Sequence, residues 1–268
     1  MPPARRSRRA MTVALAMLRA LALPLFAAGE ATAGPYASNA TLIANAATAK
    51  SSDGPRVGVW GLAGTEGVSF TNSPISLETD LAYLNATGPG FTSQQYALAE
   101  NLTWASQALR LGATLGGHGF DNPRGRSGTV NYGVYDIWFP SQSVTLAAKA
   151  GAFSGHARGG YAGGAGYWYA TPDIGFFGSV DWSGYEARFQ EADWTALAQV
   201  LPSHRLPVSV VAGYTRTQVS GAMSFRANTA FLALRFFWNR SGAVSLVGRE
   251  RTGAVGWPGA FGPQGIGF

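Results

Sequence analysis

Residues 109–116 read Leu-Arg-Leu-Gly-Ala-Thr-Leu-Gly, and this stretch decides the fold class of the chain. Every second residue in it is apolar, and the residues between are arginine, glycine or threonine. A period of two residues is typical of a β-strand with one apolar face. The same alternation returns in residues 144–151, 173–182 and 232–238. The sequence therefore predicts an all-β protein.

Turn sequences divide the alternating part of the chain into about twelve strands, with ten as the alternative. The first two expected strands span residues 55–63 and 68–72. Short turns are expected at residues 72–74, 105–106, 140–142, 171–172 and 202–205, and longer segments at 64–67, 87–92, 121–127, 154–158, 185–192 and 219–227. Short periplasmic turns that alternate with longer outer loops are typical of an up-and-down barrel in a bacterial outer membrane. An even number of strands would return both termini to the periplasm.

The composition favours a membrane barrel over a soluble β-sandwich. Only 13% of the residues are charged, whereas 36 of the 268 residues are glycine. In a sandwich the outward strand positions meet water and should be polar, but here one face of each strand is apolar and the other carries small, polar or charged residues. In lipid every backbone polar group must be paired, and a closed sheet does this without helices. We expect a closed antiparallel up-and-down transmembrane β-barrel over residues 55–238.

The two ends of the chain are predicted to lie outside the barrel. Residues 1–33 combine an arginine-rich start, an apolar run and the small residues Ala31-Thr32-Ala33, which together indicate a signal peptide. A membrane anchor is the alternative, although the run is shorter than the roughly 20 residues a spanning helix needs. Residues 34–54 are interpreted as a flexible periplasmic lead-in, and residues 239–268 as a Gly/Pro-rich C-terminal extension.

Charge and composition also limit the partners. The net charge is +6 for the whole chain, and most of it lies in the leader, so the mature chain lacks the basic surface that nucleic acid binding needs. We expect outer-membrane lipid and the barrel assembly machinery as partners, and no nucleic acid. The chain contains no cysteine, which excludes disulfides and thiolate sites. No cofactor or metal site is predicted, and the oligomeric state is left open.

Aromatic residues gather at the ends of the expected strands, where tryptophan and tyrosine would form girdles at the two membrane interfaces. They are Trp104, Trp138, Phe139, Trp168, Tyr169, Trp182, Tyr185, Phe237 and Trp238. Two carboxylates fit the apolar face poorly. Glu100 shares a face with Leu98 and Leu102, and Asp136 shares a face with Val134 and Trp138. Either a bulge shifts the register there, or these faces turn toward the lumen.

Residues 206–238, LPVSVVAGYTRTQVSGAMSFRANTAFLALRFFW, resemble the last hairpin of small outer-membrane β-barrel proteins of Gram-negative bacteria. In particular, they resemble porin-like proteins without an established activity. The next segment, SLVGRERTGAV at residues 245–255, is similar to a tail that follows a barrel. The resemblance implies a barrel in the outer membrane and implies no reaction. Such barrels usually end the chain on an aromatic residue of the last strand, whereas here a further segment follows Trp238.

The candidate functional surface is the lumen. Five charged side chains are predicted to line it: Arg110, Lys149, Asp173, Asp181 and Arg235. If they pair, they plug a narrow barrel with salt bridges; if they surround water, they tune the passage of ions. Barrels of about eight strands are filled by side chains and barrels of about sixteen leave a channel, so twelve strands lie between the two cases.

The leading functional hypothesis is a structural role or porin-like passage of small solutes. The first alternative is a surface interaction or adhesion barrel that acts through the outer loops at residues 121–127 and 185–192. The second is a hydrolase or acyltransferase at the outer rim, where His118, His156, Ser154 and Asp121 could approach one another. No motif supports this enzyme, so no catalytic residue is assigned.

Overall fold

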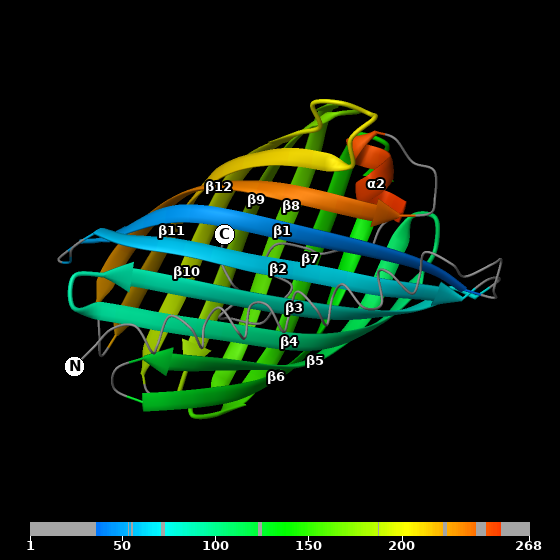
Figure 1. Cartoon of the computed structure of the whole chain (residues 1–268). Helices are drawn as coiled ribbons and strands as arrows, with labels where there is room; N and C mark the ends of the chain where they lie inside the picture. The colour runs from blue at the N-terminus through cyan, green and yellow to red at the C-terminus, as the bar shows by residue number, and fades with distance from the viewer. Residues whose placement is uncertain are drawn as a thin grey trace.

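Twelve antiparallel strands close into a barrel in which each strand pairs with its sequence neighbours and β1 pairs with β12 (Figure 1). The computed structural model describes residues 36–52, 54, 56–70, 73–122, 125–186, 188–221, 224–239 and 245–252. The strands are β1 (Tyr36–Ser51), β2 (Arg56–Phe70), β3 (Ile75–Gly88), β4 (Phe91–Ala105), β5 (Leu109–Asn122), β6 (Gly125–Ser141), β7 (Val144–Gly155), β8 (Gly159–Thr171), β9 (Ile174–Tyr185), β10 (Phe189–Val200), β11 (Val208–Gly221) and β12 (Phe225–Asn239). The predicted fold and the predicted twelve strands are confirmed. The predicted signal peptide lies outside the described residues.

The first two strands differ from the prediction. Residues 36–51, expected to be part of a flexible lead-in, form β1 and close the barrel between β12 and β2. The expected strands 55–63 and 68–72 are one strand, β2, and the expected loop 64–67 lies inside it. The alternation was not recognised in β1 because small residues, mostly alanine, occupy both of its faces. Its lumen face carries Thr41, Ile43 and Asn45, while Ala44 and Ala46 face outward.

The long outer loops that the sequence predicted are absent from the described part of the chain. Most residues of the expected loops belong to strands: β5 runs to Asn122 and β6 begins at Gly125, while β9 runs to Tyr185 and β10 begins at Phe189. Polar and glycine-rich sequence does not distinguish a loop from a strand here, because lumen-facing positions in a barrel are also polar or small. The longest connection is residues 201–207 between β10 and β11.

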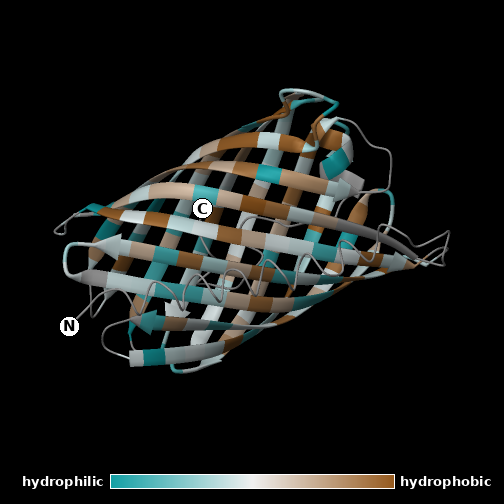
Figure 2. Ribbon diagram, in the orientation of Figure 1, coloured by the Kyte–Doolittle hydropathy of each residue, from teal (hydrophilic) through white to brown (hydrophobic). Residues whose placement is uncertain are grey.

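The outer surface is apolar, and the alternation of hydropathy along the strands is visible in Figure 2. Leu115 and Val134 are each 61% exposed, and both point away from the lumen. Large apolar side chains exposed in this way occur on all sides of the barrel, including Trp60, Leu102, Trp168, Val180, Trp194, Val210 and Leu232. A monomer surrounded by water rarely exposes so much contiguous apolar surface. The outside of the barrel is therefore suited to hydrocarbon.

The predicted aromatic girdle is correct only in part. Trp104, Trp138, Trp168, Trp182 and Trp238 are exposed on the outer face. The buried side chains of Tyr169, Tyr185 and Phe237 belong to the lumen, as does Phe139, whose ring lies beneath the Arg110 guanidinium. Neighbouring residues of a strand point to opposite faces. In a pair such as Trp168–Tyr169, the first side chain therefore faces outward and the second faces the lumen.

Glu100 and Asp136, the two carboxylates that fit the apolar face poorly, face outward, and the register does not shift at either position. Glu100 pairs with Thr79 of β3, whose hydroxyl donates to it at 2.9 Å. Asp136 lines an outer groove together with Leu111 and Val134. The only register shift that β6 makes with β7 lies between Trp138 and Ser141. Both alternatives offered by the sequence, a bulge at these positions or an inward turn of the face, are therefore wrong.

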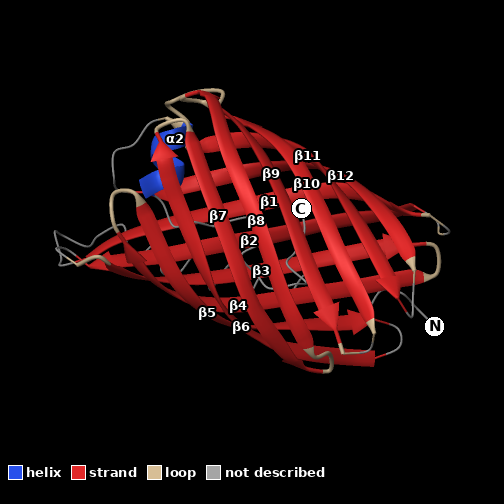
Figure 3. Ribbon diagram, turned by 180° about the vertical axis from the view of Figure 1, so that it is seen from behind, coloured by secondary structure: helices blue, strands red, loops and turns tan. Residues whose placement is uncertain are grey.

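A short helix follows the last strand, within the segment predicted to be only a Gly/Pro-rich extension. The helix, α2 (Leu246–Thr252), lies at the end of the barrel where β1 begins and β12 ends, here called the terminal end; the opposite end is called the distal end (Figures 1 and 3). No helix in the described residues is long and apolar enough to span a membrane. Residues 240–244 and 253–268 of the predicted extension lie outside the described part.

Candidate functional site

The structure brings four of the five predicted lumen residues to the lumen wall. Arg110, Lys149, Asp181 and Arg235 project inward from β5, β7, β9 and β12, between outward-facing apolar neighbours. Asp173 instead lies in the turn between β8 and β9, at the terminal mouth. The arginines are stacked on rings: the guanidinium carbon of Arg235 is 5.0 Å from the Phe237 ring centre.

Lys149 and Asp181 form an ion pair inside the barrel. The Lys149 Nζ atom lies 2.7 Å from Asp181 Oδ1, and the exposed fractions of the two side chains are 14% and 23%. Lys149, Gly163 and Asp181 occupy one row across β7, β8 and β9. Because Gly163 has no side chain, the ion pair can pass over β8. This pairing matches the salt-bridged arrangement that was one of the two possibilities for the lumen.

Replacing Gly163 with valine is expected to push this ion pair apart. A Cβ atom at position 163 would overlap Asp181 Oδ1 and come within 2.9 Å of Lys149 Cε. Both atoms belong to the ends of flexible side chains beside a cavity, so the expected loss in the free energy of unfolding is at the low end of the cost of overpacking, about 1 kcal/mol. The control is Gly164→Val on the outer face, where the nearest atom to an added Cβ is Ala147 O at 3.8 Å. Urea unfolding followed by tryptophan fluorescence measures both; equal stability of the two variants would contradict the prediction.

Four lumen carboxylates were missed in the sequence: Glu78, Asp80, Glu191 and Asp193. Glu78 and Asp80 are 5% and 2% exposed on the inner face of β3. Their alternation with Leu77, Thr79 and Leu81 could have revealed them. Glu191 lies in the segment 185–192, for which the sequence predicts a loop. Asp193 lies opposite Asp181 and accepts a hydrogen bond from the Thr217 hydroxyl.

Aromatic side chains narrow the lumen near the distal end. Phe153, Tyr161 and Tyr185 form a buried cluster with Phe189 packed against it. The Tyr185 and Phe189 rings stack with centres 4.0 Å apart, and the Tyr185 hydroxyl donates to Glu191 at 3.1 Å. These residues lie on β7 to β10 between the distal end and the row that contains Lys149 and Asp181.

Helix α2 covers part of the terminal mouth. Leu246 is fully buried and belongs to the same apolar cluster as Leu201 and Phe237. The Arg249 guanidinium donates to the backbone oxygens of Leu206 and His204, at 3.2 Å each. Burial lowers the pKa of Arg249, and the nearby Asp173 carboxylate opposes that shift.

The turn beneath α2 is tied to the helix by hydrogen bonds. Asp173 Oδ1 accepts from the Leu246 backbone N–H at 3.4 Å, and Asp173 Oδ2 lies 2.6 Å from His204 Nε2. The Val247 backbone N–H donates to Pro172 O at 3.1 Å, and the Ser245 hydroxyl accepts from the Gly248 N–H at the start of the helix. Asp173 therefore links the turn between β8 and β9 to His204 and to α2 at the terminal mouth, and it does not line the lumen wall.

The residues considered for a rim enzyme do not converge. His118 points into the lumen, where its ring contacts Phe120 at 4.3 Å. Ser154 and Asp121 lie on the outer face, where Asp121 pairs with Arg126 at 3.1 Å. A catalytic set needs its members within hydrogen-bond reach, and the sheet separates the His118 ring from Ser154 and Asp121. The described residues also contain no group of three or more His, Cys, Asp or Glu suited to a metal ion.

Known structures share this architecture, although no protein-family model and no curated protein sequence matches the chain. The NanC porin superposes with a TM-score of 0.53 at 8% identity, over 72% of this chain and 98% of the NanC chain. The fold is that of an outer-membrane β-barrel. An outer membrane channel from Pseudomonas putida F1 gives a TM-score of 0.53 at 11% identity, over 77% of this chain and 97% of that chain. At these identities the likeness concerns the fold. The apolar outer surface and this fold place the barrel in the lipid of the bacterial outer membrane.

Proposed function

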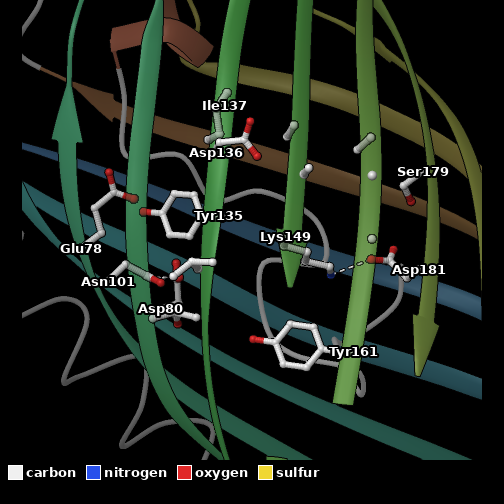
Figure 4. Close-up of a pocket in the computed structure, with 17 residues that line it drawn as sticks. Glu78, Asp80, Asn101, Tyr135, Asp136, Ile137, Lys149, Tyr161, Ser179 and Asp181 are labelled. Carbon is white, nitrogen blue, oxygen red and sulfur yellow. Dashed lines mark hydrogen bonds and ion pairs between the residues drawn. The ribbon is translucent and has the colours of Figure 1, made fainter. Parts of the chain in front are cut away.

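We propose that the barrel is a narrow channel for small polar solutes. The observation that carries this proposal is a cavity within the lumen whose lining includes the charged residues Glu78, Asp80, Asp136, Lys149 and Asp181 among neutral ones (Figure 4). A purely structural barrel could fill its interior with apolar side chains alone, which avoids the cost of burying charge. The fold shared with a porin and an outer membrane channel supports the same proposal.

The passage is narrow. The cavity has a volume of about 30 Å³, enough for one or two water molecules. Aromatic rings constrict the lumen at the distal end, and α2 covers part of the terminal mouth. We therefore expect small conductance steps, and solutes no larger than small ions or small polar molecules. Insertion by the barrel assembly machinery remains part of the proposal.

The experiment is a planar-bilayer recording of the purified mature protein. Folded protein is selected first by its faster migration on gels without boiling, since closed membrane barrels often resist SDS until heated. The proposal expects discrete conductance steps in potassium chloride. It also expects vesicles containing the barrel to swell faster in small polar solutes than in a trisaccharide. Folded protein that stays silent in the bilayer and does not speed swelling would contradict the proposal.

Two other functions receive less support. The distal connections between strands are only two to four residues long, so they offer little surface for adhesion to a partner. The rim-enzyme hypothesis lacks a converging set of residues.

A further inference from the structure

The charged middle of the lumen carries an excess of negative charge. Within the described strands, five carboxylates and three cationic side chains face the lumen. The carboxylates are Glu78, Asp80, Asp181, Glu191 and Asp193, and the cations are Arg110, Lys149 and Arg235. A lumen with this balance attracts cations and repels anions.

Around the cavity, one carboxylate has only neutral hydrogen-bond donors. Lys149 pairs with Asp181, and Arg110 interacts electrostatically with Glu78. The buried Asp80 carboxylate accepts hydrogen bonds from the Thr65 hydroxyl and from Asn101 Nδ2, both at 2.5 Å. Neutral donors stabilise a carboxylate but do not cancel its charge. The carboxylates that face the cavity from the lumen, Glu78, Asp80 and Asp181, therefore outnumber the nearby cations Lys149 and Arg110 by one.

Two oxygen atoms at the same cavity have no hydrogen-bond partner. They are Thr114 Oγ1 and Asn101 Oδ1, and their residues are 8% and 2% exposed. Both residues line the cavity, and they are direct register partners on β4 and β5. Asn101 is in turn the register partner of Glu78 on β3. Buried oxygens without a donor are costly, so the arrangement calls for an occupant that is positively charged or donates hydrogen bonds.

We propose that a small monovalent cation occupies the cavity beside Asp80, Asn101 and Thr114 and makes the channel select for cations. This inference rests on the proposed channel function. The cavity volume of about 30 Å³ limits the occupant to an alkali ion or ammonium with at most one or two waters. Divalent metals need several close carboxylate or imidazole ligands, and the described residues contain no such group.

The test measures ion selectivity and saturation of the wild-type barrel in planar bilayers. The reversal potential in a potassium chloride gradient is expected to give a potassium-to-chloride permeability ratio well above one. Conductance is expected to saturate as the concentration of potassium chloride or ammonium chloride rises, as a site that binds the ion requires. A difference in half-saturation between the two salts shows which cation the site prefers.

Two variants test the site itself. Asp80→Asn removes the charge, and occupancy by the cation should fall about tenfold or more. Thr114→Val removes one oxygen without changing charge, and the half-saturating concentration should rise about two- to tenfold. The control is Asp121→Asn on the outer face, whose carboxylate pairs with the exposed Arg126. Each variant is first checked for folding by its gel shift, so that Thr114→Val tests the site if Asp80→Asn fails to fold.

The outcomes separate the two proposals. A folded barrel that conducts nothing overturns the channel function. A barrel that conducts potassium and chloride equally, or whose conductance does not saturate, leaves the channel standing and overturns the cation site. The cation site is also overturned, and the channel left standing, if Asp80→Asn and Thr114→Val behave like Asp121→Asn, because water alone would then occupy the cavity.

Discussion

Replacing Leu246 with aspartate is expected to raise the single-channel conductance of the barrel severalfold. Leu246 is fully buried against lumen side chains at the terminal mouth. Burying a carboxylate there costs several kcal/mol. The few backbone contacts of α2 stabilise its docked position by less than this cost. The helix is therefore expected to leave the mouth and to widen the passage. Single-channel recording in planar bilayers measures the change.

The matched control is Leu206→Asp. Leu206 lies at the same mouth but is 56% exposed, so its replacement leaves α2 in place and should alter conductance little. Arg249→Ala is expected to give a smaller rise than Leu246→Asp, because it removes two hydrogen bonds to backbone oxygens and leaves the apolar contact. If Leu246→Asp is folded and conducts like the wild type, α2 does not limit the passage.

Replacing Leu232 with arginine is expected to lower the free energy of unfolding by about 2–4 kcal/mol. Leu232 is 58% exposed near the middle of β12, and its register partners are Ala46 and Ala212. An arginine at this depth would face hydrocarbon with no carboxylate on either register partner. Urea unfolding of the barrel in lipid vesicles measures the loss.

The comparison variant is Ser220→Arg, on the same outer face but next to the distal end of β11. A charge near the interface costs only about 0–1 kcal/mol. Equal losses for Leu232→Arg and Ser220→Arg would show that the outer surface of β12 does not lie in hydrocarbon.

The sequence predicted most of the barrel because its strands alternate strongly. In β5, leucine stands on one face and arginine, glycine or threonine on the other, and in β12 Leu232, Leu234 and Phe236 alternate with Ala233 and Arg235. This alternation predicts that Arg110 and Arg235 face the lumen. In β1 the contrast between the faces is weak, because alanine occurs on both. Hydrogen bonds to β12 and β2 hold β1 in the closed barrel. Because β12 is far from β1 in the sequence, no local sequence pattern indicates this pairing.

The candidate site was predicted less completely than the fold. The Lys149–Asp181 pair spans three strands, and its geometry depends on the register and on Gly163. Glu191 was hidden in a segment taken for a loop. Asp173 is predicted to face the lumen because it alternates with Ile174 and Phe176 at the start of an expected strand, yet it lies in a turn and binds His204 and α2. Contacts made by a helix after the last strand cannot be read from strand alternation.

The most direct test of the account is a cysteine scan of β5 in lipid vesicles. The chain has no cysteine, so a single introduced thiol carries the only label. Labels on the outer positions Leu111, Ala113 and Leu115 should be quenched by brominated lipid tails, and labels on the inner positions Arg110, Thr114 and His118 should not. Equal quenching at the outer and inner positions, or no quenching at any of the six, would contradict a barrel with a lipid-facing exterior and a separate lumen.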